Sequence, residues 1–484
     1  MGIVKSQSIQ NTFSTYLGFG LGAVNTLFLY THFLTDAYYG LVAFILSTSN
    51  IIMPLMAFGV HNSIIKYYSS YRTKHSIQSF LTMMLFLPLL AIIPIGGMGY
   101  LAFDVIVESL SVKNPIVSDY VAHIYLVAIA MAYFEVFFAW SKVHMQTVFG
   151  NFMKEVFHRL AIMILLFTVH LEWLSIPAFV NGVVVVYLVR MLIMKITAFS
   201  IQFPKLRFHK VSNFREVFSY SAIIIIAGSV ATLLLDIDKF MLNYYIPIEE
   251  VAYYSVAVFI ATVISVPQRA MHQILAPLNA KFLNEDNLPE LQNLYLRSSI
   301  TLFTVSGLIF LLIVLNINQL YKIIPNQFSI GLYVVFFISA AKLFDSLLGS
   351  NNAILFNSQY YRVVVLLGVI LAIATVVFNL IFIPIFGING AAFATFLAMV
   401  LYNVFKLFYV NRKFKVQPIS SKTVALTAII VVSMIVFYFW EFPFHPLINI
   451  ILKSALISLS YAVMVIKFQI SEDVIAVFRA YKKK

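Results

Sequence analysis

The feature that most constrains the fold of this chain is a succession of long apolar segments separated by short polar stretches. Each segment has about 20 residues or more, which is enough for one helix to cross a hydrocarbon core of about 30 Å. Lipid cannot satisfy backbone N–H and C=O groups, so a crossing segment has to pair them internally, as a helix does. We therefore predict an all-α polytopic membrane protein with about fourteen transmembrane helices. The predicted spans are 11–34, 40–66, 77–103, 117–141, 153–172, 174–198, 216–246, 251–275, 298–319, 328–351, 361–385, 388–411, 422–440 and 446–467.

The composition agrees with a lipid-facing surface. Hydrophobic residues make up 61% of the chain and charged residues 11%, against about 45–50% and about 25% in soluble domains. A soluble protein of 484 residues with so few charges would lack a polar shell. The chain has no cysteine, which excludes disulfides and thiolate metal sites. We predict no metal site and no cofactor.

The positions of the charges predict the orientation. The net charge is +13, and the basic residues gather on alternate connections between the predicted spans. This is the pattern of the positive-inside rule, and it places both termini in the cytoplasm. It also accounts for the positive charge without a nucleic-acid partner, because the basic residues form no single stripe. The acidic residues on the outside connections are Asp36, Asp104, Glu108, Asp119, Glu172, Glu249, Glu250 and Glu441.

A short repeat suggests that the chain is duplicated. Residues 37–42 read AYYGLV at the start of the second predicted span, and residues 252–257 read AYYSVA at the start of the eighth. Chance similarity between apolar segments is the alternative, since Ser255 stands where the first copy has Gly40. Two like-oriented halves with a substrate site at their interface are a recurrent transporter architecture. We predict two pseudo-symmetric six-helix lobes plus two C-terminal helices. The predicted parts are an N-terminal lobe at 1–200, a basic cytoplasmic linker at 201–215, a C-terminal lobe at 216–411, and the last two helices with a basic tail at 412–484.

Several short motifs occur in an order and at spacings that resemble a known family. They are Tyr39-Gly40-Leu41, Phe58-Gly59-Val60, Ile64-Ile65-Lys66, the LDIDKFML segment at 235–242, and the PIFGINGAAFAT segment at 384–395. Together they are similar to the multidrug/oligosaccharidyl-lipid/polysaccharide (MOP) exporter superfamily, in its polysaccharide transporter branch with the O-antigen (Wzx-type) flippases. The resemblance covers essentially the whole chain.

The resemblance implies a function. Such a flippase would move a polyprenyl-diphosphate-linked oligosaccharide, an O-antigen or capsule-type repeat unit, from the inner to the outer leaflet by alternating access. It would reside in the bacterial cytoplasmic (inner) membrane as a multi-pass protein, and a polysaccharide polymerase and chain-length proteins would be its partners. It would not be an enzyme.

Polar side chains within the spans are the candidate site residues, because an ionisable group at mid-bilayer costs about 2.5–3.5 kcal/mol and needs a partner or an aqueous cavity. Arg269 and His272 follow Pro267 and share a helix face. Arginine binds phosphate with a two-pronged fork, so Arg269 suits a diphosphate. The predicted headgroup residues are Arg269, His272, Lys342, Lys239, Asn25 and Asn50. The predicted residues that balance charge or couple Na⁺ or H⁺ are Asp236, Asp238, Asp345 and Glu135.

Each of these predictions has an alternative. Lys342 with Asp345, and Asp238 with Lys239, could be ion pairs that only hold helices together. A related multidrug (MATE-like) cation antiporter would use an acidic, aromatic-lined cavity, and the carboxylates keep that reading open. A membrane polymerase, ligase or glycosyltransferase would need a long extramembrane loop, whereas the longest outside connection runs only about from Tyr100 to Ile116.

Overall fold

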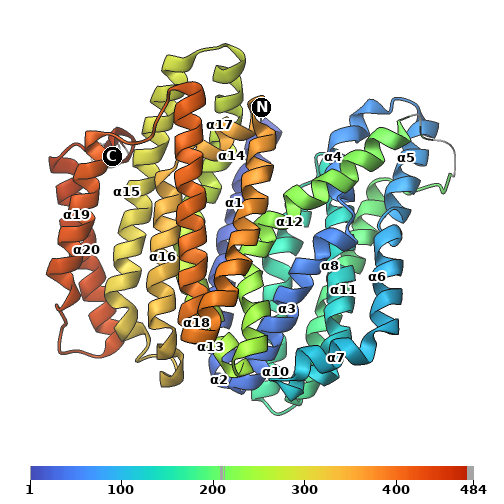
Figure 1. Cartoon of the computed structure of the whole chain (residues 1–484), viewed down its shortest axis with the longest axis horizontal. Helices are drawn as coiled ribbons and strands as arrows, with labels where there is room; N and C mark the ends of the chain where they lie inside the picture. The colour runs from blue at the N-terminus through green and yellow to red at the C-terminus, as the bar shows by residue number, and fades with distance from the viewer. Residues whose placement is uncertain (1, 208–210, 212, 477–484) are drawn as a thin grey trace. The chain divides into compact units, whose positions relative to one another are not determined.

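The computed structural model describes residues 2–207, 211 and 213–476, and its regular elements in these ranges are all helices (Figure 1). The helices form two compact units, Met1–Ala252 and Tyr253–Lys484. The predicted all-α class is confirmed. The boundary between the units lies after the seventh predicted span, and the division into two lobes of six helices remains a prediction.

Ten helices within the described ranges are long and apolar enough to cross a membrane. They are Asp36–Met56, Lys74–Leu101, Pro115–Val143, Ile176–Ile201, Ile248–Arg269, Leu288–Leu320, Asn326–Leu347, Arg362–Phe414, Ser421–Tyr438 and Pro446–Lys467. One of them, Arg362–Phe414, covers two predicted spans, because α18 (Tyr361–Phe414) consists of two helical stretches that meet at a non-helical residue, Gly387, with φ 54° and ψ −132°. The predicted spans 11–34, 153–172 and 216–246 do not appear among the ten. The number fourteen therefore remains a prediction.

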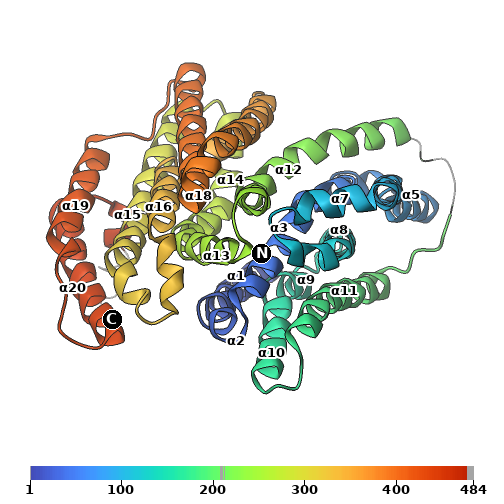
Figure 2. The same cartoon turned by 60° about the horizontal axis from the view of Figure 1, so that its bottom comes forward.

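The first unit is built around four helices that pack side by side. In it α3 packs against α8 and α12, and α8 packs against α11 (Figure 2). Large aromatic side chains fill its core, among them Phe80, Phe134 and Trp140. Its elements are α1 (Gly2–Val24), η1 (Asn25–Leu29), α2 (Tyr30–Phe33), α3 (Asp36–Met56), α4 (Val60–Tyr67), η2 (Tyr68–Ser70), α5 (Lys74–Phe86), α6 (Leu89–Leu101), α7 (Phe103–Ser111), η3 (Pro115–Tyr120), α8 (Val121–Val143), α9 (Val148–Phe152), η4 (Met153–Phe157), α10 (His158–His170), α11 (Ile176–Ile201), α12 (Phe214–Tyr245) and the start of α13 (Ile248–Thr262).

The helix breaks in this unit have local causes. Gly59 lies in the turn between α3 and α4 and precedes the first residue of α4; its φ is +64°, a conformation that side chains with a Cβ rarely adopt. A Cβ at Gly59 would also lie 2.4 Å from the Ser221 carbonyl oxygen on α12. Pro88 separates α5 from α6, since it cannot donate a backbone hydrogen bond. The glycine in the motif at 58–60 thus allows α3 to bend against α12.

A buried asparagine fastens the α7–η3 connection to the end of α12. The side-chain N–H₂ of Asn114 donates to the Asn243 carbonyl oxygen at 2.9 Å and to the Ile246 carbonyl oxygen at 3.1 Å. Its Oδ1 accepts from the Ile248 amide at 2.8 Å, and Asn243 Nδ2 donates to the Leu110 carbonyl oxygen at 2.9 Å. Asn114 and Asn243 are both buried. This network holds one end of the unit together.

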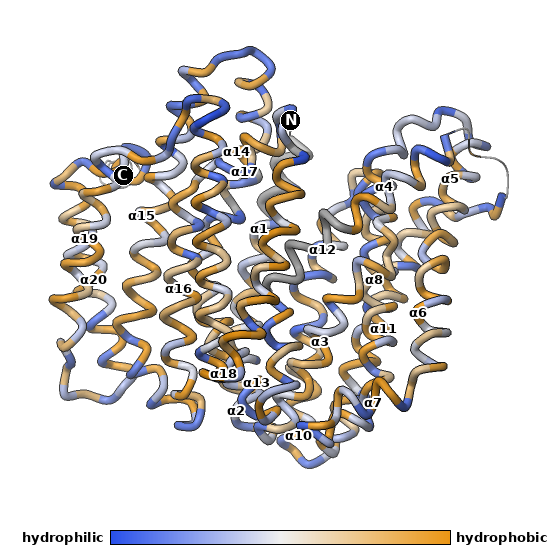
Figure 3. The backbone as a smooth tube through the Cα atoms, in the orientation of Figure 1, coloured by the Kyte–Doolittle hydropathy of each residue, from blue (hydrophilic) through white to orange (hydrophobic). Residues whose placement is uncertain are grey.

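In the second unit, α15 packs against α14, α16, α19 and α20, and α16 packs against α18. The hydrophobic core lies between α15, α19 and α20, with Leu311, Leu426, Ile457 and Tyr461 buried in it. Long hydrophobic stretches dominate the middle of these helices in Figure 3, and the hydrophilic colour gathers at their ends. Its elements are the rest of α13, η5 (Val263–Ser265), α14 (Val266–Asn284), α15 (Leu288–Leu320), η6 (Asn326–Gly331), α16 (Leu332–Leu347), α17 (Asn351–Phe356), α18 (Tyr361–Phe414), α19 (Ser421–Tyr438) and α20 (Pro446–Lys467).

Candidate functional site

The carboxylate of Asp345 on α16 is the centre of a polar cluster in the second unit. Its Oδ1 lies 3.9 Å from Lys406 Nζ on α18. Its Oδ2 accepts a hydrogen bond of 3.0 Å from Gln268 Nε2 on α14. Asp345 thereby connects α16 with α14 and α18. Its two contacts position the side chains of Gln268 and Lys406.

Lys406 is the most deeply buried cation of this cluster. Its side chain is 1% exposed. Its Nζ donates to Asn352 Oδ1 on α17 at 3.0 Å and lies 4.2 Å from the centre of the Tyr402 ring. A buried ammonium needs such partners, because the loss of water is costly.

Three predicted residues lie around the same carboxylate. Asp345 and Lys406 both act electrostatically on the His272 imidazole. The Lys342 ammonium is attracted by Asp345 and repelled by Arg269, whose side chain is exposed. The structure therefore brings Arg269, His272, Lys342 and Asp345 into one cluster in the second unit. Among the described residues of this cluster, Lys342 and Lys406 both interact with the single carboxylate of Asp345, and Arg269 lies close enough to Lys342 to repel it. Basic groups therefore outnumber the carboxylate, which suits an anion better than a cation.

Lys342 and Asp345, which the sequence suggested as an ion pair, are not a close pair in the structure. The two side chains interact electrostatically, but the ion pair within 4.0 Å that the described residues form at Asp345 is with Lys406. Lys342 is attracted by Asp345 and, less strongly, repelled by Arg269.

The first unit holds a second group of predicted residues. Lys239 Nζ lies 3.3 Å from Asp236 Oδ1, one turn earlier on α12. The Asn50 side chain on α3 forms a hydrogen bond with the same carboxylate. The lysine thus pairs with Asp236, whereas the sequence suggested its neighbour Asp238 as a partner. Asp238 is buried. The Asp236–Lys239 pair is formally neutral.

Glu135 and Asn25 occupy separate positions in the first unit. Glu135 on α8 accepts a hydrogen bond of 2.6 Å from Lys154 Nζ on η4. The Asn25 side chain donates to the Arg159 carbonyl oxygen at 2.8 Å and is buried. Both contacts connect a helix to the α9–α10 segment.

Three buried cations, Arg190, Lys406 and Lys453, are not among the predicted site residues. Lys406 lies inside the predicted span 388–411. Arg190 is 7% exposed, and its guanidinium lies 4.2 Å from the Phe134 ring and 4.7 Å from the Tyr187 ring. Stacking on rings can hold a buried arginine. The distance from the end of the span could have identified Lys406: it lies more than one helical turn before the polar residues that begin at Asn411.

Among the described residues, no three His, Asp or Glu side chains lie where they could hold a metal ion together.

Comparison with known proteins identifies the family of the chain. The sequence profile of a family described as polysaccharide biosynthesis protein matches residues 5–278. The chain belongs to this family. No curated protein sequence matches it.

Comparison with solved structures identifies the fold of this chain. A lipid II flippase MurJ in an inward closed conformation superposes with a TM-score of 0.69 at 14% identity, over 97% of this chain and 99% of that one. An inward-facing multidrug resistance MATE family transporter gives 0.59 at 14% identity, over 86% and 95%. A MOP superfamily transporter from Pyrococcus furiosus gives 0.58 at 14% identity, over 85% and 96%. The chain thus has the MOP exporter fold, and the predicted resemblance to a polysaccharide-type exporter is confirmed.

Proposed function

We propose that this protein is a flippase for a polyprenyl-diphosphate-linked oligosaccharide. It would move an O-antigen or capsule-type repeat unit from the inner to the outer leaflet of a bacterial cytoplasmic membrane, with both termini in the cytoplasm, by alternating access. Its membership of a polysaccharide biosynthesis family and its likeness in fold to a lipid II flippase support this class of substrate.

The observation that carries the proposal is the excess of positive charge around Asp345. Lys406 and Lys342 both interact with this single carboxylate, and Arg269 acts on Lys342, in the described part of the cluster. A diphosphate would supply the missing negative charge, and its oxygens would accept hydrogen bonds from the guanidinium and ammonium groups. Within a water-poor surrounding this attraction is stronger than at an exposed surface. Arg269, the exposed member, would make the first contact.

Carboxylates would compensate the positive charge of the cluster after the headgroup has left. Asp345 already holds Lys406 and Gln268, so a proton or Na⁺ arriving at Asp345 would weaken these contacts. Asp236 with Lys239 offers the same chemistry in the first unit. Ion coupling through H⁺ or Na⁺ at these carboxylates is part of the proposal. So is cooperation with a polysaccharide polymerase and chain-length proteins.

A cation antiporter is the alternative, and the charges favour it less. A cationic substrate needs carboxylates that it can approach, but Asp236 and Glu135 are each paired with a lysine, at 3.3 Å and 2.6 Å. A cation would have to displace that lysine first. An anionic headgroup meets no such barrier at Arg269.

Transport by the purified full-length chain in proteoliposomes tests the proposal. One set of vesicles would carry a fluorescent polyprenyl-diphosphate oligosaccharide in the inner leaflet, and a second set would contain a fluorescent organic cation in the lumen. We expect transfer of the lipid-linked glycan to exceed that of protein-free vesicles by at least tenfold, with cation efflux at background. Cation efflux driven by a H⁺ or Na⁺ gradient, with no glycan transfer, would replace the flippase by the antiporter.

A further inference from the structure

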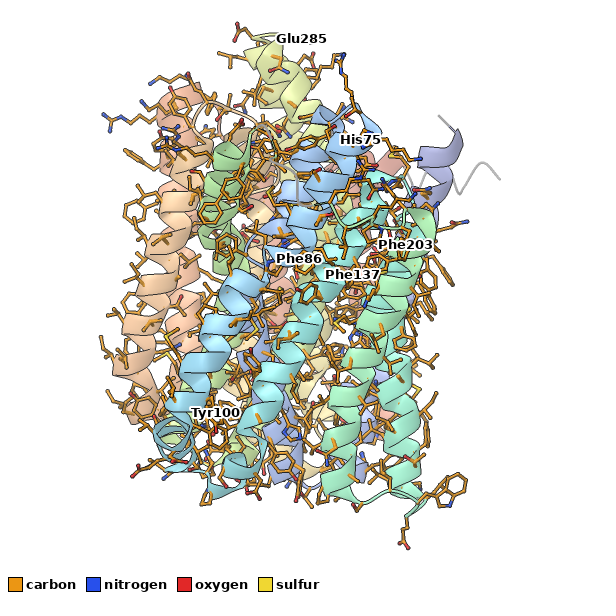
Figure 4. The ribbon with its side chains drawn as sticks, turned by 90° about the vertical axis from the view of Figure 1, so that its right-hand side faces the viewer. His75, Phe86, Tyr100, Phe137, Phe203 and Glu285 are labelled. Atoms are coloured by element: carbon orange, nitrogen blue, oxygen red, sulfur yellow. The ribbon has the colours of Figure 1, made fainter. Side chains whose placement is uncertain are left out.

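Arg190 on α11 is a buried cation of the first unit without a close counter-charge. Its side chain is 7% exposed, and its guanidinium lies 4.2 Å from the Phe134 ring on α8 and 4.7 Å from the Tyr187 ring, one turn earlier on α11. The two helices pack side by side, and Phe137, one turn after Phe134, is labelled on α8 in Figure 4. Among the described residues, the guanidinium forms no ion pair and no hydrogen bond. A charge at this depth is normally paired, so its partner has to be explained.

The two carboxylates that act on Arg190 are already engaged by other cations. Glu135 on α8 accepts a hydrogen bond of 2.6 Å from Lys154, and Glu155 lies 3.4 Å from Arg159, one turn later. Both glutamates attract the Arg190 guanidinium from farther away, and Arg159 repels it. Their attraction therefore does not replace a partner in contact with the guanidinium.

Basic groups outnumber acidic groups in this part of the first unit. Lys142 on α8 is attracted by Glu135 and repelled by Lys154. The imidazoles of His61 and His158 also interact with these charges, and protonation of either would add positive charge. Among the described residues, the group linked in this way contains two carboxylates and four permanent cations, namely Glu135, Glu155, Lys142, Lys154, Arg159 and Arg190. Two positive charges are therefore left uncompensated within it.

The guanidinium of Arg190 has an open edge. Its Nε is enclosed and has no hydrogen-bond partner, whereas its terminal nitrogens Nη1 and Nη2 keep surface that no described atom covers. The hydroxyl of Tyr187 also forms no hydrogen bond with a described residue and is not fully enclosed. Arg190 and Tyr187 are three residues apart and share a face of α11. Their unpaired donors are therefore available to one ligand.

A small anion has the chemistry that this arrangement lacks. The terminal N–H groups of an arginine point in parallel, and charge-assisted hydrogen bonds to an anion are stronger than neutral ones. A cation would be repelled by the excess positive charge, and a neutral ligand would leave that charge uncompensated. Because the Born cost of removing an ion from water rises with the square of its charge, a deep site favours a monovalent anion over phosphate. The small exposed fraction of Arg190 favours an ion over a bulky organic anion.

We propose that Arg190 and Tyr187 bind a small monovalent inorganic anion of halide size, such as chloride, inside the first unit. The Nη1 and Nη2 groups of Arg190 would donate to the anion, and the Tyr187 hydroxyl would add a further hydrogen bond. Arg159 would contribute attraction from farther away. The bound anion would offset one of the two uncompensated charges and thereby stabilise the first unit. This inference does not depend on which substrate the protein transports.

Thermal unfolding of the purified full-length chain in detergent measures this binding, because a ligand that binds only the folded state raises the Tm. Sodium chloride would replace sodium gluconate, whose anion is larger, at constant ionic strength. We expect a saturable rise in Tm of about 3 °C. Arg190→Gln removes the guanidinium and should abolish the rise. Lys195→Gln removes an exposed cation from the same helix and should retain it.

Crystals of the full-length chain grown in sodium bromide would locate the anion. We expect an anomalous bromide peak in contact with Nη1 or Nη2 of Arg190. Tyr187→Phe keeps the ring and removes only the hydroxyl, so it should weaken the affinity for chloride by about threefold or more. If Arg190→Gln does not fold, the bromide peak and the Tyr187→Phe variant decide.

Several results would overturn the inference. They are a Tm that responds equally to chloride and gluconate, a chloride response that persists in Arg190→Gln, and bromide crystals with no peak at Arg190. Loss of the chloride response on addition of inorganic phosphate would make free phosphate the occupant, and its loss only with phosphatidylglycerol would make a lipid headgroup the occupant; both would replace the halide. None of these measurements requires translocation, so their outcome leaves the proposed function to its own test.

Discussion

The Nζ of Lys406 lies 3.9 Å from the Oδ1 of Asp345, across the contact between α18 and α16. The lysine is 1% exposed and Asp345 is 22% exposed, so the cation depends on its partner more than the carboxylate does. A buried charge that loses its counter-charge destabilises the fold, whereas an intact buried pair contributes little net stability. The pair is therefore the structural support of the cluster in the second unit.

Asp345→Asn should lower the stability of the second unit. Removing one partner of a buried ion pair costs about 3–5 kcal/mol, and the partial exposure of Asp345 places the expected loss near the lower end. Thermal unfolding of the purified protein in detergent would show a lower Tm. Asp345→Asn combined with Lys406→Met should melt above the single variant, because the uncompensated ammonium is gone. A double variant that melts lower still would contradict the pairing.

Asn114→Ala should destabilise the first unit. The change leaves the Asn243 and Ile246 carbonyl oxygens and the Ile248 amide without their buried partner, and each unsatisfied group costs about 1–3 kcal/mol. The expected result is a lower Tm and faster proteolysis of the loop between α7 and η3. Asn326→Ala, at an exposed position, is the control and should melt like the original chain. Equal Tm values for both variants would show that the network contributes little.

Gly40→Ala should impair folding although alanine favours helices. A Cβ at Gly40 would lie 1.8 Å from the Ile248 carbonyl oxygen, so α3 and the α12–α13 turn would have to separate. Gly20→Ala makes the same substitution on α1, where nothing lies within 4 Å of the new Cβ. Membrane-inserted yield and Tm would be measured for both. We expect a marked fall for Gly40→Ala and an unchanged or slightly higher value for Gly20→Ala.

Close packing of this kind explains why some sequence features were informative. The Tyr39-Gly40-Leu41 motif contains a glycine at the point where the backbone at Ile248 leaves no room for a Cβ. Gly59, in the second motif, adopts the left-handed conformation in the turn from α3 to α4. Hydropathy located most spans, since only helices can satisfy their backbone groups in lipid. The number of spans was less secure, because the predicted spans 11–34, 153–172 and 216–246 are not among the candidate spans of the described residues.

The partners of the buried charges could not be predicted from the sequence. Spacing along one helix suggested Lys342 for Asp345, but Lys406 comes from α18, some 60 residues later. Such contacts depend on which helices pack together, which hydropathy does not specify. Lys406 and Arg190 lie toward the ends of the predicted spans 388–411 and 174–198, where the positive-inside rule alone would account for a basic residue, although both are buried. A long side chain near a helix end can point inward as well as toward water.

Arg269→Gln should reduce transfer of the lipid-linked glycan by at least tenfold while the protein still inserts and folds. The glutamine keeps much of the length but loses the charge and the two-pronged geometry that suit a phosphate. Lys281→Gln removes a cation from the same helix, where its exposed side chain pairs with Glu285, and should transfer normally. The proteoliposome assay measures both. Wild-type transfer by the Arg269 variant would remove that residue from the site.

The dependence of transfer on headgroup charge tests the central claim most directly. The full-length chain in proteoliposomes would be offered the same polyprenyl oligosaccharide linked through a diphosphate, through a monophosphate and through an uncharged ether. The cation excess around Asp345 predicts the fastest transfer for the diphosphate, a slower rate for the monophosphate, and background for the ether. Equal rates for the three lipids would contradict a headgroup site built on Arg269, Lys342 and Lys406.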